Sequence, residues 1–268
     1  MSHTTPGADR RGISPTEISV QLFTVQTLMS RDAGGTLSRI ADLGFRQVEM
    51  AGTHGLSADR FRTLLDARGL AATSGHRSYA ELLADPDRVL GECAILGHRF
   101  VVCPWLPPEN RSIPGMHDVA TSLNRLGELA RRRGIRLGYH NHDFEFIDEL
   151  NGAPFEALMA ATDPDLVHLE LDVYWVAKAG RDPLQLLRLY GDRVLQMHLK
   201  DLDWAGGIAD LGTGTLDLRG LIQEGQDRRV TEYIIEHDNP VDPFATVSAG
   251  LAYISNWSRA RGAVGSVR

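Results

Sequence analysis

The chain has 268 residues, of which 43% are hydrophobic and 24% are charged. These proportions are those of an ordinary globular protein, so they exclude global disorder, a collagen-like fibre and a multi-span membrane protein. The chain carries 28 Lys and Arg against 35 Asp and Glu, a formal net charge of -7. Because an acidic chain repels phosphate backbones, we expect no nucleic-acid partner.

Cysteine usage and the N-terminal segment indicate where the protein works. Cys93 and Cys103 form no CxxC pair, which excludes a cysteine zinc ribbon and a disulfide framework and is typical of a reducing compartment. Residues 1–15 lack the apolar run of a signal peptide, and nowhere do about 18 apolar residues follow one another. We therefore expect a cytoplasmic protein with no membrane partner.

Short apolar runs alternate with amphipathic segments along the chain. The predicted strands, in chain order, are 18–25, 47–50, 71–75, 100–103, 135–140, 167–171, 194–198 and 233–236. The predicted helices that follow them, in the same order, are 36–43, 58–68, 79–95, 118–133, 154–161, 182–190, 216–225 and 242–259. Strict alternation predicts a parallel sheet covered by helices, and eight such units in about 250 residues favour a single closed (β/α)8 TIM barrel over an open sheet.

The domain organisation follows from this pattern. We expect a flexible N-terminal tail over 1–16, the catalytic barrel over 17–260 and a flexible C-terminal tail over 261–268. The first strand is not followed by a GxGxxG or GxxxxGK[ST] motif, so no phosphate-binding loop is predicted there.

Polar residues gather where the predicted strands end, which is where a barrel of this type carries its active site. Strand alternation places His140 and His142 on one side of the fifth strand. In the same way, Glu170 and Asp172 share one side of the sixth strand, and His198 and Lys200 share one side of the seventh. Charges are costly to cluster without a cation. Mixed imidazole and carboxylate ligands therefore predict one divalent metal ion, with Mn²⁺ preferred and Co²⁺, Zn²⁺ or Fe²⁺ as alternatives.

Four segments carry a resemblance to a known family. They read YHNHDFEF at 139–146, LELDVYW at 169–175, MHLKD at 197–201 and IEHD at 235–238. From about residue 18 to 258 the chain resembles the xylose isomerase-like TIM barrels, the sugar phosphate isomerase/epimerase superfamily. That group also includes ketose 3-epimerases, inosose dehydratase and endonuclease IV.

The resemblance implies a set of metal ligands. The epimerases of the family bind one divalent metal through a glutamate, an aspartate, a histidine and a glutamate on strands five to eight. By position these correspond to His140, Asp172, His198 and Glu236, so this chain has a histidine where the epimerases have their first glutamate. The His-x-His form resembles the inosose dehydratase branch and enzymes acting on 3-keto-glycosides. His142 or Glu145 could supply the missing contact, and the choice between His140 and His142 as ligand stays open.

The resemblance also implies the chemistry. In the epimerases, two glutamates on opposite sides of the substrate move a proton next to a carbonyl, and the metal stabilises the enediolate. Here Glu236 is the expected base, and His142 or Glu145 is its expected catalytic partner. The predicted function is a divalent-metal-dependent isomerase or epimerase of a keto-sugar or sugar phosphate. The alternative is a lyase or dehydratase of a keto-cyclitol or 3-keto-glycoside; a metal-free binding subunit and an endonuclease IV-like phosphodiesterase are less favoured.

The remaining candidates are predicted to contact a small-molecule sugar substrate. Glu49 and His76 could bind sugar hydroxyls, and Trp105 and Trp175 could stack on a sugar face or contact another subunit. Lys200 could hold an anionic oxygen of the substrate or pair with the neighbouring Asp201. A homo-oligomer or a partner subunit is also compatible with the sequence.

Overall fold

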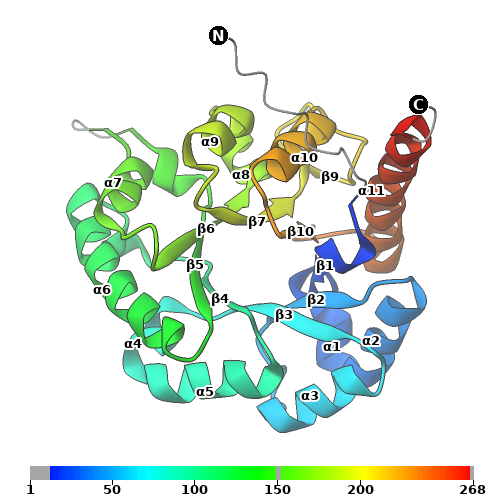
Figure 1. Cartoon of the computed structure of the whole chain (residues 1–268), viewed down its shortest axis with the longest axis horizontal. Helices are drawn as coiled ribbons and strands as arrows, with labels where there is room; N and C mark the ends of the chain where they lie inside the picture. Colours follow the sequence, from blue (N-terminus) through cyan, green and yellow to red (C-terminus); the bar gives the residue numbers. More distant parts are fainter. Residues whose placement is uncertain (1–12, 149–151, 266–268) are drawn as a thin grey trace.

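Eight parallel strands close into a barrel surrounded by helices in the computed structural model, which describes residues 13–148 and 152–265 (Figure 1). Around the barrel the order is β1-β10-β7-β6-β5-β4-β3-β2, which confirms the predicted (β/α)8 fold. The barrel strands are β1 (Ile18–Gln21), β2 (Gln47–Ala51), β3 (Ala71–His76), β4 (Phe100–Cys103), β5 (Arg136–His140), β6 (Val167–Asp172), β7 (Val194–Leu199) and β10 (Glu232–Ile235). A short antiparallel pair follows β7 and consists of β8 (Asp201–Leu202) and β9 (Ile208–Ala209).

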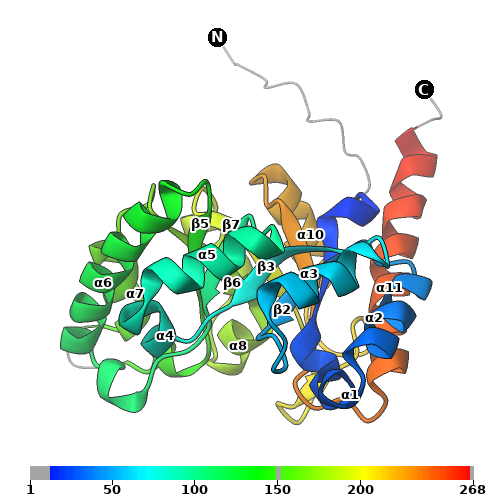
Figure 2. The ribbon, with the colours of Figure 1, turned by 90° about the horizontal axis from the view of Figure 1, so that it is seen from below.

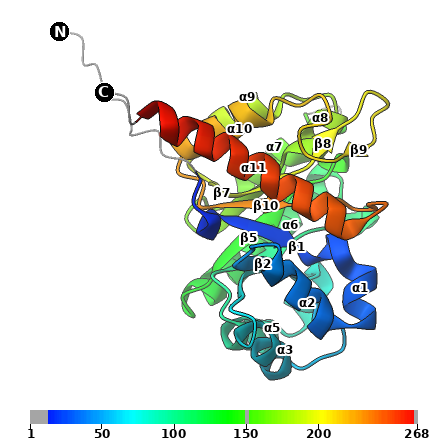
Figure 3. The ribbon, with the colours of Figure 1, turned by 90° about the vertical axis from the view of Figure 1, so that its right-hand side faces the viewer.

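The helices form the outer layer. They are α1 (Gln26–Arg31), α2 (Ala33–Asp42), α3 (Ala58–Asp66), α4 (Tyr79–Ala84), α5 (Pro86–Leu96), α6 (Ile113–Arg131), α7 (Pro154–Ala161), α8 (Val173–Lys178), α9 (Pro183–Tyr190), α10 (Leu218–Asp227) and α11 (Pro243–Gly265). Four 3-10 turns complete the described chain: η1 (Pro15–Glu17), η2 (Leu22–Val25), η3 (Pro108–Asn110) and η4 (Phe144–Phe146). Helix α11 runs along the outside of β10 and β1 (Figure 3).

Several elements differ from the predicted boundaries; α6, for example, begins at Ile113 rather than at 118. The first strand stops at Gln21, because its side-chain oxygen accepts the N–H of Phe23 and the backbone turns into η2. The predicted helix over 79–95 is two helices, since Pro86 lacks an N–H and Asp85 caps a new first turn. Helix α11 continues past 259 to Gly265; of the predicted tails, 1–12 and 266–268 lie outside the described residues.

Alternation along the strands separates an apolar outer face from a polar interior. In β7, Leu195, Met197 and Leu199 alternate with Gln196 and His198, whose side chains meet other inward-facing groups. The outward residues pack with the helices into one continuous hydrophobic core. The interior is therefore free to carry polar and ionisable groups.

One end of the barrel is built differently from the other. The short helices α1, α4 and α8 come soon after β1, β3 and β6 and lie at the end where the strands finish (Figure 2).

Within the described chain, no helix has the length and apolar character needed to cross a membrane.

Candidate functional site

Seven ionisable side chains, six from five strands and one from the residue that follows β10, converge at the C-terminal end of the barrel. Parallel register brings them level, since His140 lies beside Glu170 and Asp172 lies beside His198 on neighbouring strands. All but one are at least nine-tenths buried, and His76 is partly buried. The set consists of Glu49, His76, His140, Glu170, Asp172, His198 and Glu236.

His198 lies at the centre of this set. Its Nε2 is 2.7 Å from Glu49 Oε1 and 3.1 Å from Glu170 Oε1. On the other side of the ring, Nδ1 is 2.7 Å from Glu236 Oε2. One fully buried imidazole therefore connects carboxylates from β2, from β6 and from the segment after β10.

Glu170 contacts two further imidazoles, those of His76 and His140. Its Oε1 is 2.8 Å from His76 Nε2 and 2.9 Å from His140 Nδ1. His76 Nε2 also lies 3.2 Å from Glu49 Oε1, and Gln21 Nε2 donates to that same oxygen at 2.8 Å. The floor of the site is thus a buried layer in which imidazoles alternate with carboxylates.

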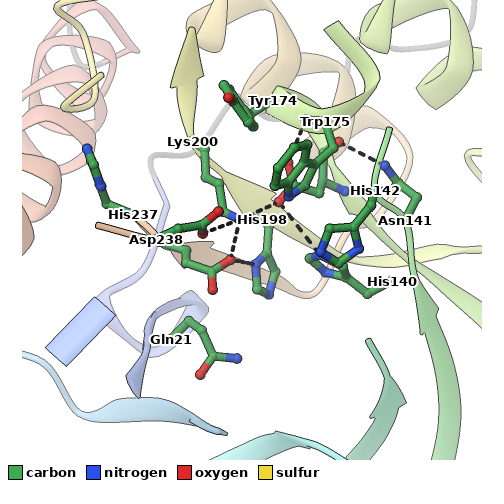
Figure 4. Close-up of polar contacts among 12 residues, drawn as sticks. Gln21, His140, Asn141, His142, Tyr174, Trp175, His198, Lys200, His237 and Asp238 are labelled. Carbon is green, nitrogen blue, oxygen red and sulfur yellow. Dashed lines mark hydrogen bonds and ion pairs between the residues drawn. The ribbon is translucent and has the colours of Figure 1, made fainter. Parts of the chain in front are cut away.

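Lys200 lies beside this layer and contacts three carboxylates (Figure 4). Its Nζ is 2.8 Å from Glu236 Oε2, 2.8 Å from Asp238 Oδ1 and 3.1 Å from Asp172 Oδ2. Lys200 does not pair with the neighbouring Asp201, because that carboxylate accepts backbone N–H groups of the loop at 212–216. The ammonium group is therefore directed into the site.

Asn141 fixes the backbone around Asp172. The amide of Asn141 accepts the Asp172 N–H at 3.0 Å and donates to its carbonyl at 3.2 Å. Asp172 Oδ1 in turn accepts the Trp175 N–H at 3.0 Å and caps α8. One carboxylate oxygen is thus used by the helix, and Oδ2 is left facing Lys200.

Burial and neighbouring charges shift the pKa values of the site. Burial opposes a charged His76, but Glu49 and Glu170 raise its pKa to about 10. Burial works against ionisation of Glu236 as well, yet Lys200 and His198 hold its pKa below the usual range. Glu236 is therefore ionised, as a metal ligand or a base must be.

Other groups shift in the opposite direction. Burial raises the pKa of Asp172 to about 6, against the lowering effect of Lys200 and His198. Burial and the charge of Lys200 lower the pKa of His142 to about 3, and burial lowers that of His140 as well. Both histidines of the His-x-His segment are consequently neutral at pH 7, the form in which imidazole binds metals.

Two overlapping groups of these residues could hold a metal ion. One is His76, His140, Glu170 and His198, and the other is Asp172, His198 and Glu236; in each, the potential ligand atoms lie within 4.8 Å of one another. Within the described residues, Glu49 Oε2 and Glu170 Oε2 are buried with no hydrogen-bond partner. Buried carboxylate oxygens of this kind need a cation or water, and the mixed nitrogen and oxygen donors fit a divalent metal.

The four predicted ligands are divided between these two groups. Asp172, His198 and Glu236 come together, whereas His140 joins the group around Glu170 and its Nε2 is 3.7 Å from Asp172 Oδ2. His142 lines the cavity above, and its Nδ1 is buried with no hydrogen-bond partner among the described residues.

Glu145 is not placed as we expected for a catalytic group. Its Oε1 accepts the Tyr139 hydroxyl at 2.7 Å, and its Oε2 accepts the His142 N–H at 2.8 Å. Glu145 is fully buried and does not line the cavity. Burial raises its pKa to about 7. In this position the carboxyl braces the backbone of the His-x-His segment.

A cavity of about 770 Å³ opens above the buried layer. Its lining consists of Phe23, Ala51, His76, Ser78, Tyr79, Ala80, Pro104, Trp105, Pro107, His140, His142, Lys200, Glu236, Asp238 and Asn239. Of the other predicted substrate contacts, Trp175 lies behind this lining, with its ring centroid 5.0 Å from that of His142 and 5.5 Å from Lys200 Nζ. Glu49 lies below the cavity, where it holds His198 and His76.

Sequence reasoning gave no specific role to four residues that contact the site: Glu170, Gln21, Asn141 and Asp238. Alternation had placed Glu170 beside Asp172 at the rim, two positions earlier on the same strand, but had not identified it as a ligand. The position of Gln21 depends on where the first strand ends, which the apolar pattern placed four residues too late.

Comparisons with known proteins agree with this architecture. Residues 37–256 match the family described as xylose isomerase-like TIM barrel. An inosose dehydratase of Geobacillus kaustophilus is 28% identical over 189 residues, which are 62% of this chain and 61% of the relative, so the match spans less than two thirds of that protein.

Two solved structures share the fold. A sugar phosphate isomerase/epimerase from Parabacteroides distasonis superposes with a TM-score of 0.78 at 23% identity, covering 94% of this chain and 97% of the other. The 3-keto-D-glucoside 4-epimerase of E. coli superposes with a TM-score of 0.71 at 20% identity, covering 90% and 99%.

Proposed function

Because the chain belongs to the xylose isomerase-like TIM barrel family, we propose that it is a divalent-metal-dependent enzyme that removes a proton from the carbon beside a carbonyl of a polyhydroxylated substrate. The observation that carries the proposal is the meeting of Asp172, His198 and Glu236 in the buried layer below the cavity, which Glu236 lines. A divalent metal held by these three residues, with His140 or His142 nearby, would polarise the substrate carbonyl.

Glu236 is the base in this proposal. It lines the cavity, it is ionised, and Lys200 and His198 fix the position of its Oε2. A carboxylate with a lowered pKa is a weak base, so it depends on an acidified carbon–hydrogen bond, which the polarised carbonyl provides. Glu236 therefore takes up the proton only from a carbon placed next to that carbonyl.

The opposite side of the cavity favours elimination as the outcome. Its ionisable lining is imidazole, from His76, His140 and His142, and the carboxylates Glu236 and Asp238 belong to the segment that follows β10. Once Glu236 has taken the proton, the carbon–oxygen bond one carbon further breaks, and the leaving oxygen takes a proton from an imidazole. The product is an unsaturated ketone, so the proposed reaction class is that of a lyase or dehydratase, which is also the class named for the Geobacillus relative.

Isomerisation or epimerisation is the second candidate. It begins with the same proton abstraction and ends when an imidazole, rather than a second glutamate, returns a proton to carbon. His76 supports it, since its raised pKa keeps a proton available at the edge of the cavity.

The test is solvent deuterium exchange with the Mn²⁺-loaded protein and a panel of keto-sugars and keto-cyclitols in D₂O. Removing a positioned base costs about 10²–10⁴-fold, so Glu236→Gln should lose exchange to that extent while it is saturated with metal. Glu128→Gln, on the exposed side of α6, is the matched control and should exchange like the wild type.

The products separate the two candidates. Elimination gives an unsaturated ketone that absorbs in the ultraviolet, whereas isomerisation gives a deuterated isomer without that absorbance. If metal-saturated Glu236→Gln exchanged at the wild-type rate, Glu236 would not be the base, and His142 would be tested next.

A further inference from the structure

The cavity above the metal-binding residues has two chemically different halves. Its floor carries the ionisable groups of the site, from His76 to Asp238. Its outer wall is apolar and comes from other elements: Phe23 from η2, Tyr79 from α4, and Trp105 with two prolines from the loop after β4. A polyol ring on the floor would therefore have an apolar surface next to it.

The wall offers few hydrogen bonds to a ligand. The Ser78 hydroxyl donates to Glu81 at 2.8 Å as part of a helix cap, and the Tyr79 hydroxyl is hydrogen-bonded to Ser122. A second sugar ring placed there would lose its hydrogen bonds to water, and its hydroxyl groups would find few partners on the wall. That loss costs free energy of binding. A flat apolar group would lose nothing of that kind.

Trp105 is held in place to receive such a group. The guanidinium of Arg111 lies 4.7 Å from the centroid of the Trp105 ring and 3.7 Å from that of Phe144, and its Nε donates to the Leu106 carbonyl at 2.9 Å. The indole is 46% exposed at the cavity mouth, where one face of it is available for stacking. Phe23, 38% exposed, adds a second aromatic ring to the same cavity.

The cavity is also poorly suited to a phosphate group. Among the residues that the structure describes, Lys200 is the one lysine or arginine that lines this cavity. Its Nζ is surrounded by three carboxylates. A phosphate dianion would approach Asp172, Glu236 and Asp238 without a free cation to receive it.

We propose that the outer half of the cavity is a subsite for an apolar, flat substituent attached to the polyol ring, and that Trp105 is its main contact. This inference rests on the proposed function and narrows its substrate class to unphosphorylated ring ketones that carry an aryl or similar group. Trp105 acts here as a specificity residue.

The experiment compares binding of four probes to the Mn²⁺-loaded full-length protein by calorimetric or NMR titration: glucose, phenyl β-glucoside, cellobiose and glucose 6-phosphate. Stacking on an aromatic side chain and burial of a phenyl ring together account for about a tenfold gain in affinity. Phenyl β-glucoside should therefore bind about tenfold more tightly than glucose, and neither cellobiose nor glucose 6-phosphate should exceed glucose.

Two variants locate the effect. Trp105→Ala should remove the phenyl advantage and leave glucose affinity unchanged. Trp204→Ala is the matched control, because Trp204 is 92% exposed outside the cavity and its loss should change neither affinity.

Three results would overturn the subsite. The first is that phenyl β-glucoside binds no more tightly than glucose, whether both bind or neither does, and the second is that glucose 6-phosphate or cellobiose binds more tightly than glucose. The third is that Trp105→Ala weakens the binding of glucose and of phenyl β-glucoside equally. Deuterium exchange into the keto-sugar panel is measured separately. Exchange without phenyl preference overturns this inference alone, and phenyl preference without exchange overturns the proposed chemistry.

Discussion

His198 shows how much the site depends on single atoms. Both of its ring nitrogens are used, Nδ1 toward Glu236 and Nε2 toward Glu49 and Glu170, and the residue is fully buried. Burial disfavours its charged form, yet the three carboxylates raise its pKa well above the usual value. Without a bound cation, the protonated ring compensates the buried negative charge of its neighbours; as a metal ligand the ring would be neutral.

Lys200 supplies a second compensating charge, and it occupies oxygens that a metal would need. Its Nζ contacts Asp172 Oδ2 and Glu236 Oε2, both candidate ligands. We expect Lys200→Met to raise Mn²⁺ affinity by about tenfold or more, or ~1.4 kcal/mol, because the competing ammonium is gone. Isothermal titration with Mn²⁺ measures it.

Lys178→Met is the control for this prediction. Lys178 lies on α8 and donates to Tyr174 at 3.1 Å, outside the ligand groups, so its removal should leave Mn²⁺ affinity unchanged. Weaker Mn²⁺ binding by Lys200→Met would show that the lysine supports the centre rather than competing with the cation.

Glu232 provides a pH-dependent prediction at the opposite end of the barrel. Burial raises its pKa to about 7, although Ser19 and Thr73 donate to its Oε1. The folded protein therefore holds this proton more tightly than the unfolded chain, and the free energy of unfolding falls as the pH rises from about 4.5 to about 7.

Glu232→Gln cannot ionise, so it does not lose this stability as the pH rises. The difference in melting temperature, variant minus wild type, should therefore increase between about pH 5 and about pH 8. Thermal denaturation at several pH values measures the difference, with the exposed Glu109→Gln as a control expected to show no trend. A constant difference across this range would mean that Glu232 has the same pKa in both states.

At the scale of elements, close packing of α6 against the start of β6 helps to place the two carboxylates that β6 carries. Gly127 lies in α6, where an added Cβ would be 2.6 Å from the Leu166 carbonyl oxygen, just before the strand begins. Glu170 and Asp172 follow on that strand, so a shift of its first residues would reach the site.

We expect Gly127→Ala to destabilise the fold by about 1–3 kcal/mol, because a backbone atom must move to accommodate the methyl group. Gly91→Ala is the matched control on α5, where an added Cβ meets nothing within 4 Å. That substitution should stabilise by up to about 1 kcal/mol through helix propensity. Chemical denaturation measures both; equal effects of the two substitutions would contradict the packing argument.

At the scale of the whole molecule, the barrel closes around several buried carboxylates, so a bound cation should stabilise the entire fold. A ligand at 100 times its Kd adds about 2.7 kcal/mol, and for a chain of this size 1 kcal/mol shifts Tm by roughly 2–4 °C. Mn²⁺ at that concentration should therefore raise Tm by roughly 5–10 °C over protein treated with EDTA.

Asp172→Asn tests the origin of that shift. It removes one candidate ligand and should lose most of the Mn²⁺ effect, as measured by differential scanning calorimetry. If the variant kept the full Mn²⁺ shift, the cation would bind elsewhere, with the group around Glu170 as the next candidate.

The sequence by itself determined the barrel and the end of it that carries the site. Eight alternating apolar and amphipathic segments admit few other folds, since each strand needs a helix to cover its outer face. The same alternation placed Asp172, His198 and Glu236 at one rim, because carboxyl ends of parallel strands in a barrel face one way. Local patterns sufficed for these conclusions.

Only the tertiary structure decided how the rim residues pair. Register between strands sets whether His140 meets Glu170 or Asp172. The end of the first strand at Gln21, four residues before the predicted end, is what brings Gln21 onto Glu49. The orientation of Glu145 toward Tyr139 depends on a 3-10 turn that periodicity does not reveal. These contacts join residues far apart in the chain or turns without a repeating pattern, so they follow from the closed barrel and not from any local segment.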